Sequence, residues 1–406
     1  MKQIGRFSPY QKVITLTLAL IQFCVVLDFM VLAPLGTFVM KDLHLEPSQF
    51  AIVVSAYAIS AFVSALLTAG FADKFDRKKL LVFFFSGFII GTLFCAMSTN
   101  YYGLLGARIF TGLFGGVMSS ISFAIITDIF EVDKRGRIMG FIQMAFGVSQ
   151  IVGIPLGLML TNWVNWHLPF YAIVGFAILV LAFVLIFMKP ITAHLAIKSE
   201  ANAFQHLMKT VRNKRYVTGF LATTLLATGG FMLMPFGSDF AVQNLKLTTD
   251  ELPWMYILTG VFTFISGPLA GIISDKFGRM KLFVSGTFIS ICIVLIYTQL
   301  GASPFWLVIL LNVILFMGIQ ARIVPAQAMM TAVPSPQDRG AFMSINSAVQ
   351  QLSGGISSFV AGLIVYKSSN GEIQNYPILG FVVTGTMIVA MIMMNRLHKL
   401  LNKDGH

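Results

Sequence analysis

A short polar loop occurs twice in this chain, each time between two long apolar stretches. The first copy reads AGFADKFDRK at residues 69–78, and the second reads GIISDKFGRMK at residues 271–281. The Asp-Lys-Phe-x-Arg core of the loop returns after 202 positions. A second landmark, Arg-Gly, occurs at residues 135–136 and 339–340 in nearly the same register, so two related halves are predicted.

The apolar stretches are long enough to cross a membrane. Hydrophobic residues make up 57% of the 406 positions and charged residues only 11%, whereas about a quarter of an ordinary soluble domain is charged. Since about 20 apolar residues cross the hydrocarbon core, twelve transmembrane helices are predicted. They cover residues 13–39, 50–72, 80–97, 102–127, 138–161, 168–188, 216–243, 252–274, 282–300, 304–330, 341–366 and 376–396.

The longest polar stretch separates six of these spans from the other six. The expected domains are an N-terminal six-helix bundle at residues 1–188, a cytoplasmic linker at 189–215 and a C-terminal six-helix bundle at 216–406. The predicted fold class is therefore an all-α membrane protein with twelve transmembrane helices in two pseudo-symmetric bundles.

Lys and Arg are concentrated on one side of the predicted membrane. If the N-terminus is cytoplasmic, 23 of the 28 basic residues fall in cytoplasmic segments and three fall outside. This bias predicts that both termini are cytoplasmic. Because the cations are spread over seven short loops, the net charge of +12 does not indicate a nucleic-acid partner.

The doubled loop resembles the signature between helices 2 and 3 of the major facilitator superfamily, G-x-L-A-D-R-x-G-R-K, and its echo between helices 8 and 9. Ala69 and Asp76 stand where this signature has Gly. Residues 106–116, GARIFTGLFGG, are similar to the helix-4 signature of the family, which carries an intramembrane Arg. The resemblance covers the whole chain. It implies a monomeric, multi-pass transporter of the bacterial inner membrane that works by alternating access and needs no cofactor.

The fifth span carries a further motif. Gly153, Pro155 and Gly157 are followed by WVNWH at residues 163–167. This arrangement is similar to the antiporter signature of arabinose-efflux-type permeases, a branch of the proton-coupled drug antiporters. Pro155 lies one position later than in the common form, and His167 replaces an Arg. The resemblance implies that a small organic molecule is exported in exchange for protons.

The same resemblance implies a gate on the cytoplasmic side. In this family the acid of the loop faces the N-terminus of helix 11, where the helix dipole favours an anion. The arginine of the loop pairs with an acid at the foot of helix 4. The matching residues are Asp73, Arg77 and Asp128, and Asp275, Arg279 and Arg339 are expected to form a weaker mirror gate. The alternative is that these residues only shape tight turns.

Charged residues within the predicted spans are candidates for the transport chemistry. Asp28 lies well inside the first span, where a carboxylate costs roughly 2.5–3.5 kcal/mol on insertion scales. It either carries a proton or binds a cation, or it is a structural carboxylate buried against Arg108 or at a polar helix junction. Arg108 tunes the protonation of Asp28, binds an anionic substrate or has a structural role. Arg322 either faces the cavity and binds an anionic substrate or extends to the cytoplasmic interface. Asp239, near the outer end of the seventh span, is expected in a periplasmic gate.

Several spans carry stripes of small and polar residues. Small residues let helices approach closely in lipid, whereas a Gln side chain is costly in hydrocarbon unless it is hydrogen-bonded. Gln143, Gln150 and Gln351 are therefore expected to face a central cavity.

An enzyme is not expected, because the sequence lacks a phosphate-binding glycine loop, a metal-ligand cluster and a nucleophile with a base. The leading prediction is proton-coupled export of a drug, sugar or metabolite by a protein embedded in membrane lipids. One alternative is an uptake symporter or facilitator for an organic anion, and another is a membrane receptor that transports nothing.

Overall fold

The computed structural model describes residues 7–68, 75–192, 195, 210–335 and 338–403. The chain divides into two compact units. Unit 1 comprises residues 1–32 and 56–204, and unit 2 comprises residues 33–55 and 205–406. The domain boundaries predicted at residues 188 and 216 stay a prediction, since most of the linker lies outside the described residues.

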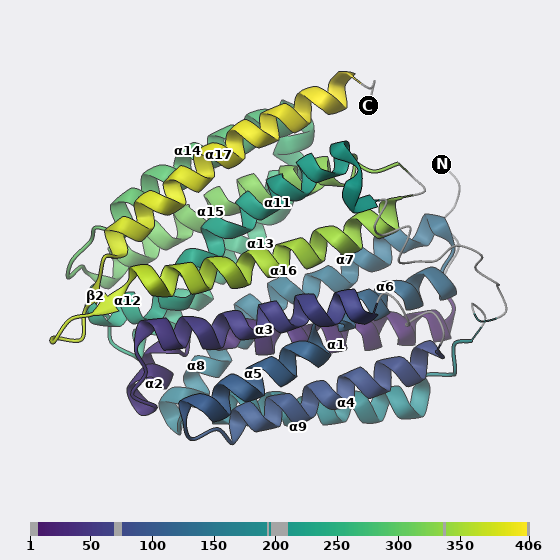
Figure 1. Cartoon of the computed structure of the whole chain (residues 1–406), viewed down its shortest axis with the longest axis horizontal. Helices are drawn as coiled ribbons and strands as arrows, with labels where there is room; N and C mark the ends of the chain where they lie inside the picture. The colour runs from purple at the N-terminus through teal and green to yellow at the C-terminus, as the bar shows by residue number, and fades with distance from the viewer. Residues whose placement is uncertain (1–6, 69–74, 193–194, 196–209, 336–337, 404–406) are drawn as a thin grey trace. The chain divides into compact units, whose positions relative to one another are not determined.

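Unit 1 is a bundle of helices (Figure 1). They are α1 (Pro9–Val31), the second half of α3 (Pro47–Thr68), α4 (Arg77–Ala96), α5 (Tyr101–Gly115), α6 (Met118–Ile129), α7 (Val132–Val148), the π-helical turn η2 (Ser149–Gly153), α8 (Ile154–Trp163) and α9 (Leu168–Phe187). Helices α4 and α9 lie side by side, and α1 packs against α7 and α9 (Figure 1). Buried apolar side chains from α1, α4, α6 and α9 form the core of this unit.

Unit 2 is also helical, with one short hairpin. Its elements are α2 (Gly36–Asp42), the first half of α3, α11 (Lys214–Leu233), the 3-10 turn η4 (Met234–Phe236), α12 (Gly237–Gln243), α13 (Glu251–Phe277), α14 (Arg279–Tyr297), α15 (Phe305–Met330), α16 (Arg339–Ile364), β1 (Tyr366–Lys367), β2 (Ile373–Gln374) and α17 (Tyr376–Lys403). The two strands pair antiparallel. Aromatic and Met side chains from α11 and α14 to α17 form the core of this unit.

All twelve predicted spans correspond to helical segments. Ten segments of the described chain are long and apolar enough to cross a membrane. The other two predicted spans correspond to residues 132–163 and to α16, which carry the polar stripes seen in the sequence. The first of these segments is divided among α7, η2 and α8, each shorter than a membrane span, and the polar stripe of α16 lowers the hydropathy of that helix.

Prolines break three spans that were predicted as continuous helices. Pro34 follows the end of α1, so the predicted span 13–39 is divided into α1 and α2. Pro235 lies in the 3-10 turn after α11, and Pro155 follows the π-helical turn η2. Proline lacks an amide proton, and its ring clashes with the carbonyl four residues earlier. The ladder of helical hydrogen bonds is therefore interrupted at each of these points.

The two copies of the repeated loop form different turns. In the first copy, Asp76 caps α4, and its carboxylate accepts hydrogen bonds from the amides of Lys78 and Ile191, both at 2.9 Å. In the second copy, Gly278 has a φ of 98°, a left-handed conformation that favours glycine. Asp76 thus replaces the usual Gly of the signature with a helix cap.

Helix α5 approaches α3 very closely. A Cβ atom at Gly112 would overlap the backbone of Tyr57 and the side chain of Ser60, and one at Gly115 would lie 2.5 Å from the Tyr57 hydroxyl. By contrast, a Cβ at Gly106, on the same helix, would meet nothing within 4 Å. In the predicted helix-4 signature, Gly112 and Gly115 therefore permit close helix packing, whereas Gly106 makes no such close contact.

This contrast gives a matched pair of variants. We expect Gly112→Ala to lower the melting temperature of the purified protein, because overpacking a filled interface costs about 1–3 kcal/mol. Gly106→Ala should leave it unchanged or raise it, since alanine favours a helix over glycine by about 1 kcal/mol. Equal melting temperatures for the two variants would contradict the close approach of α5 to α3.

Candidate functional site

The intramembrane charges of unit 1 form an ion pair. Asp28 on α1 and Arg108 on α5 are 0% and 1% exposed. The Asp28 Oδ2 and Arg108 Nη1 atoms are 2.8 Å apart. A buried charge without a partner is costly, so each residue of the pair compensates the burial of the other.

Two further side chains contact this pair. The Thr92 hydroxyl on α4 lies 3.1 Å from the second carboxylate oxygen of Asp28. The ring of Tyr57 on α3 lies 4.6 Å from the guanidinium carbon of Arg108, within the range of a cation–π contact. Four helices therefore meet at this buried ion pair.

Thr92 and Tyr57 were not among the sequence-based candidates. Thr92 is one of two hydroxyl-bearing residues in the predicted span 80–97. Its polarity in an apolar span is the sequence feature that could have identified it. Tyr57 has no such signal, because an aromatic residue in an apolar span is usual. Gln22 on α1 was also missed, although it is the lone amide of the first predicted span. It is 8% exposed and accepts a hydrogen bond from the Ser119 hydroxyl at 3.2 Å.

The pair can adopt two charge states. While the Asp28 carboxylate is ionised, the charges of Asp28 and Arg108 cancel. A proton bound to Asp28 removes the negative charge and leaves the Arg108 guanidinium in apolar surroundings with only the Tyr57 ring and polar neutral groups. Because an unpaired buried charge is costly, proton binding favours any rearrangement that supplies Arg108 with a new partner.

The predicted gate residues of unit 1 are partly brought together. Arg77 begins α4 and Asp128 lies near the end of α6, and the Nε and Oδ2 atoms of this pair are 3.0 Å apart. The two side chains are 7% and 15% exposed. Asp73 lies outside the described residues. The role of these residues in a gate stays a prediction.

The mirror residues of unit 2 are arranged differently. Asp275 near the end of α13 and Arg279 at the start of α14 are both exposed. Arg339 begins α16, but its side chain lies outside the described part of the chain. The two copies of the loop are therefore similar in sequence but differ in how deeply their charged side chains are buried.

Unit 2 contains a buried carboxylate of its own. Asp239 on α12 is fully buried, and its Oδ2 atom lies 2.9 Å from Nζ of Lys367 on β1. The Asn244 side chain exchanges two hydrogen bonds with the backbone of Ile373, each 2.9 Å long. The β1–β2 hairpin is thereby attached to α12.

The remaining candidates are not part of the ion pairs described above. Arg322 on α15 is 5% exposed. Gln150 in η2 and Gln351 in α16 are half-buried, and the side chain of Gln143 lies outside the described residues. Their expected orientation towards a cavity stays a prediction.

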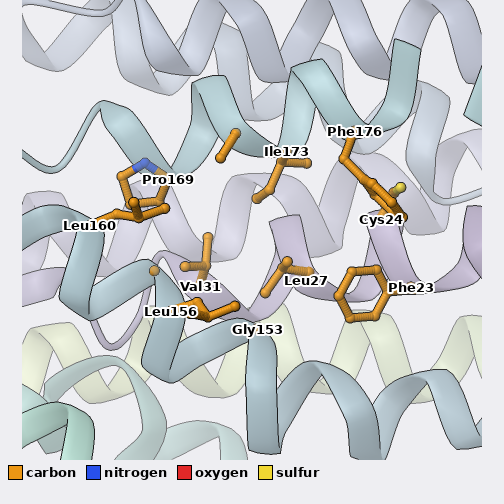
Figure 2. A pocket seen from close by; sticks show the side chains of 12 residues that line it. Phe23, Cys24, Leu27, Val31, Gly153, Leu156, Leu160, Pro169, Ile173 and Phe176 are labelled. Carbon is orange, nitrogen blue, oxygen red and sulfur yellow. The ribbon is translucent and has the colours of Figure 1, made fainter. Parts of the chain in front are cut away.

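The antiporter-like motif lies beside an apolar pocket. This pocket, of about 150 Å³, is lined by α1, α8 and α9 (Figure 2). Gly153 and Gly157 line it, and a Cβ at Gly153 would lie 2.5 Å from Leu27. Pro155 lies just after the π-helical turn η2, at the point where the regular hydrogen-bond ladder of the span is interrupted. Neither Asp28 nor Arg108 lines this pocket.

Comparisons with known proteins agree with this architecture. The model of the Major Facilitator Superfamily matches residues 18–242 and again residues 219–403. The uncharacterized MFS-type transporter YceJ of Bacillus subtilis (strain 168) is 22% identical over 95% of both chains. A probable sugar efflux transporter of Helicobacter pylori (strain J99 / ATCC 700824) is 24% identical over 63% of this chain and 62% of its own. The crystal structure of a D-xylose–proton symporter superimposes with a TM-score of 0.76 at 19% identity, covering 95% of this chain and 97% of that one.

The buried pair predicts a strong coupling between Asp28 and Arg108. Arg108→Gln should destabilise the protein by about 3–5 kcal/mol, because it leaves a buried carboxylate without a cation. Adding Asp28→Asn should restore part of this loss, since the double variant buries no charge at this site. Melting temperatures of the four proteins in a double-mutant cycle measure the coupling. Additive losses would contradict a direct interaction between the two side chains.

The two copies of the loop arginine should differ in the same assay. Arg77→Gln removes a hydrogen-bonded charge from a mostly buried pair, which costs about 1.5–3 kcal/mol. Arg279→Gln removes an exposed charge and should change the melting temperature little. If both variants lose the same stability, the structural difference between the two turns is wrong.

Proposed function

Because the chain belongs to the Major Facilitator Superfamily, we propose that it exports a small organic molecule in exchange for protons. It is a multi-span membrane transporter and not an enzyme. Direction, proton coupling and substrate are the parts of this function that we propose.

The observation that carries the proposal is the buried pair of Asp28 and Arg108. Its carboxylate lies inside a span, has no exposed surface and contacts helices α4 and α5 through hydrogen bonds. A carboxylate at such a depth is a functional candidate by default. In this mechanism, a proton binds Asp28, Arg108 is released from the pair, and the helices that contact it repack.

The available driving force is sufficient for export. A proton that moves inward contributes about 2.3 kcal/mol per 100 mV of membrane potential. This free energy supports a roughly fiftyfold concentration gradient of the exported molecule at room temperature.

Alternating access needs a binding site that opens to one side of the membrane at a time, and charged pairs near the two ends of the spans are candidates to control that opening. We assign the pair of Arg77 and Asp128 to the cytoplasmic side and the pair of Asp239 and Lys367 to the outer side. The charge bias of the loops supports this orientation in the bacterial inner membrane, with both termini in the cytoplasm. The protein acts as a monomer in lipid in this proposal.

Uptake of an organic anion, by symport with protons or by facilitated diffusion, is the second candidate. The buried Arg322, without a described hydrogen-bond partner at two of its nitrogens, favours it. Flux into proteoliposomes under a pH gradient of either sign separates the candidates, because an antiporter moves its substrate against the proton flow and a symporter moves it with the flow. A receptor would exchange nothing.

The proposed coupling can be tested before the substrate is known. Proteoliposomes on a solid-supported membrane should give a transient charge displacement when the pH is lowered, because protons enter a buried site. Asp28→Asn should abolish this signal. Asp250→Asn, which changes an exposed carboxylate at the start of α13, should preserve it. An undiminished signal in Asp28→Asn would exclude this residue as the proton carrier.

A further inference from the structure

Arg322 lies deep within helix α15 of unit 2. Met330, at the nearer end of the helix, is eight positions away, about 12 Å along the helix axis. The residue is 5% exposed, and its Nε and Nη2 atoms are buried. An arginine that extends to the interface exposes its guanidinium, so this expectation from the sequence does not fit the structure.

The guanidinium is poorly compensated. Its Nε and Nη2 atoms have no hydrogen-bond partner among the described residues. The ring of Phe283 on α14 lies 6.0 Å from the guanidinium carbon. A ring face attracts a cation but does not replace the hydrogen bonds of a carboxylate.

The buried and half-buried carboxylates named here already have partners. Asp28 and Asp128 each pair with an arginine of unit 1. In unit 2, Asp239 pairs with Lys367, and Asp338 accepts hydrogen bonds from two hydroxyl groups. The other described acids of unit 2 are exposed or already engaged: Asp42, Glu46, Asp250, Glu251, Asp275 and Glu372. None of these described carboxylates is within hydrogen-bonding distance of the two buried nitrogens.

We propose that Arg322 binds an anionic group of the transported molecule, a carboxylate or a phosphate. Nε and Nη2 form one edge of the guanidinium, so their free protons point in parallel and match the two oxygens of such a group. This inference rests on the proposed transport function because it takes the ligand to be the substrate. It does not depend on the direction of transport.

One neighbouring side chain bears on the rest of the ligand. Phe283, whose ring lies 6.0 Å from the guanidinium carbon of Arg322, belongs to an apolar cluster of unit 2. An anion that carries an aromatic or other apolar body fits such surroundings, because the body buries apolar surface while the charge pairs with Arg322. The predicted substrate class is therefore an amphipathic organic anion.

Thermal stability of the purified full-length protein provides the test, with sodium benzoate as the probe and uncharged benzamide as its control at constant ionic strength. Inorganic phosphate is a second probe that distinguishes a preference for phosphate from one for a carboxylate. Benzoate or phosphate, but not benzamide, should raise the melting temperature of the wild type. Arg322→Gln should weaken the apparent affinity for the effective anion roughly tenfold or more. Arg322→Lys, which keeps the charge without the planar edge, should weaken it less.

Two controls keep this test decisive. Arg396→Gln removes an exposed arginine of α17 and should behave as the wild type. Without ligand, Arg322→Gln should melt no lower than the wild type, because it removes a buried charge that has no hydrogen bond at these nitrogens. A marked loss of stability in that variant would show a structural role and overturn the proposal. The absence of any anion effect on the wild type, or an equal effect on Arg322→Gln, would overturn it as well.

Asp28→Asn separates this inference from the proposed proton coupling. The anion effect should persist in that variant, since Asp28 and Arg322 lie in different units and Asp28 already pairs with Arg108. If the wild type responds to the anion but shows no proton-dependent charge displacement, the proposed coupling fails and the anion site stands. If the charge displacement is present and the anion effect is absent, the anion site fails and the proposed coupling stands.

Discussion

The salt bridge between Asp28 and Arg108 is the interaction on which the arrangement of unit 1 depends. It joins α1 to α5, while Thr92 and Tyr57 bring α4 and α3 to the same point. A pair of charges in an apolar interior is tolerated only with good geometry and additional hydrogen bonds. The absence of a side chain at Gly112, four residues after Arg108, lets α5 approach α3 closely enough for that geometry.

The two halves of the chain have kept a common plan and diverged in their charges. The first copy of the loop buries Arg77 against Asp128, whereas Arg279 of the second copy is exposed. The intramembrane arginine of unit 1 has a carboxylate partner, whereas Arg322 has no hydrogen bond at two of its nitrogens. We propose that unit 1 binds the proton and unit 2 binds the substrate. Different roles of this kind would explain why the charges of the two units differ.

Much of this fold follows from the sequence, because lipid restricts a spanning chain to few solutions. Length and hydropathy locate all twelve helical segments, and the doubled loop reveals the repeat. The breaks near Pro34, Pro155 and Pro235 were missed, although proline marks each of them, because hydropathy averages over a whole span. Asp28 and Arg108 were identified as charges that need partners. Thr92, Tyr57 and Gln22 were not, because a neutral polar side chain in a span gives a weak signal until its neighbours are known.

The central claim is that Asp28 gains and loses a proton while Arg108 changes partner. Infrared difference spectroscopy of the reconstituted protein, recorded as the pH is lowered, measures this directly. The account predicts that a band from a protonated carboxyl group appears in the wild type and is missing in Asp28→Asn. If the Asp28 carboxylate stays ionised over the whole pH range in which transport proceeds, the account is contradicted.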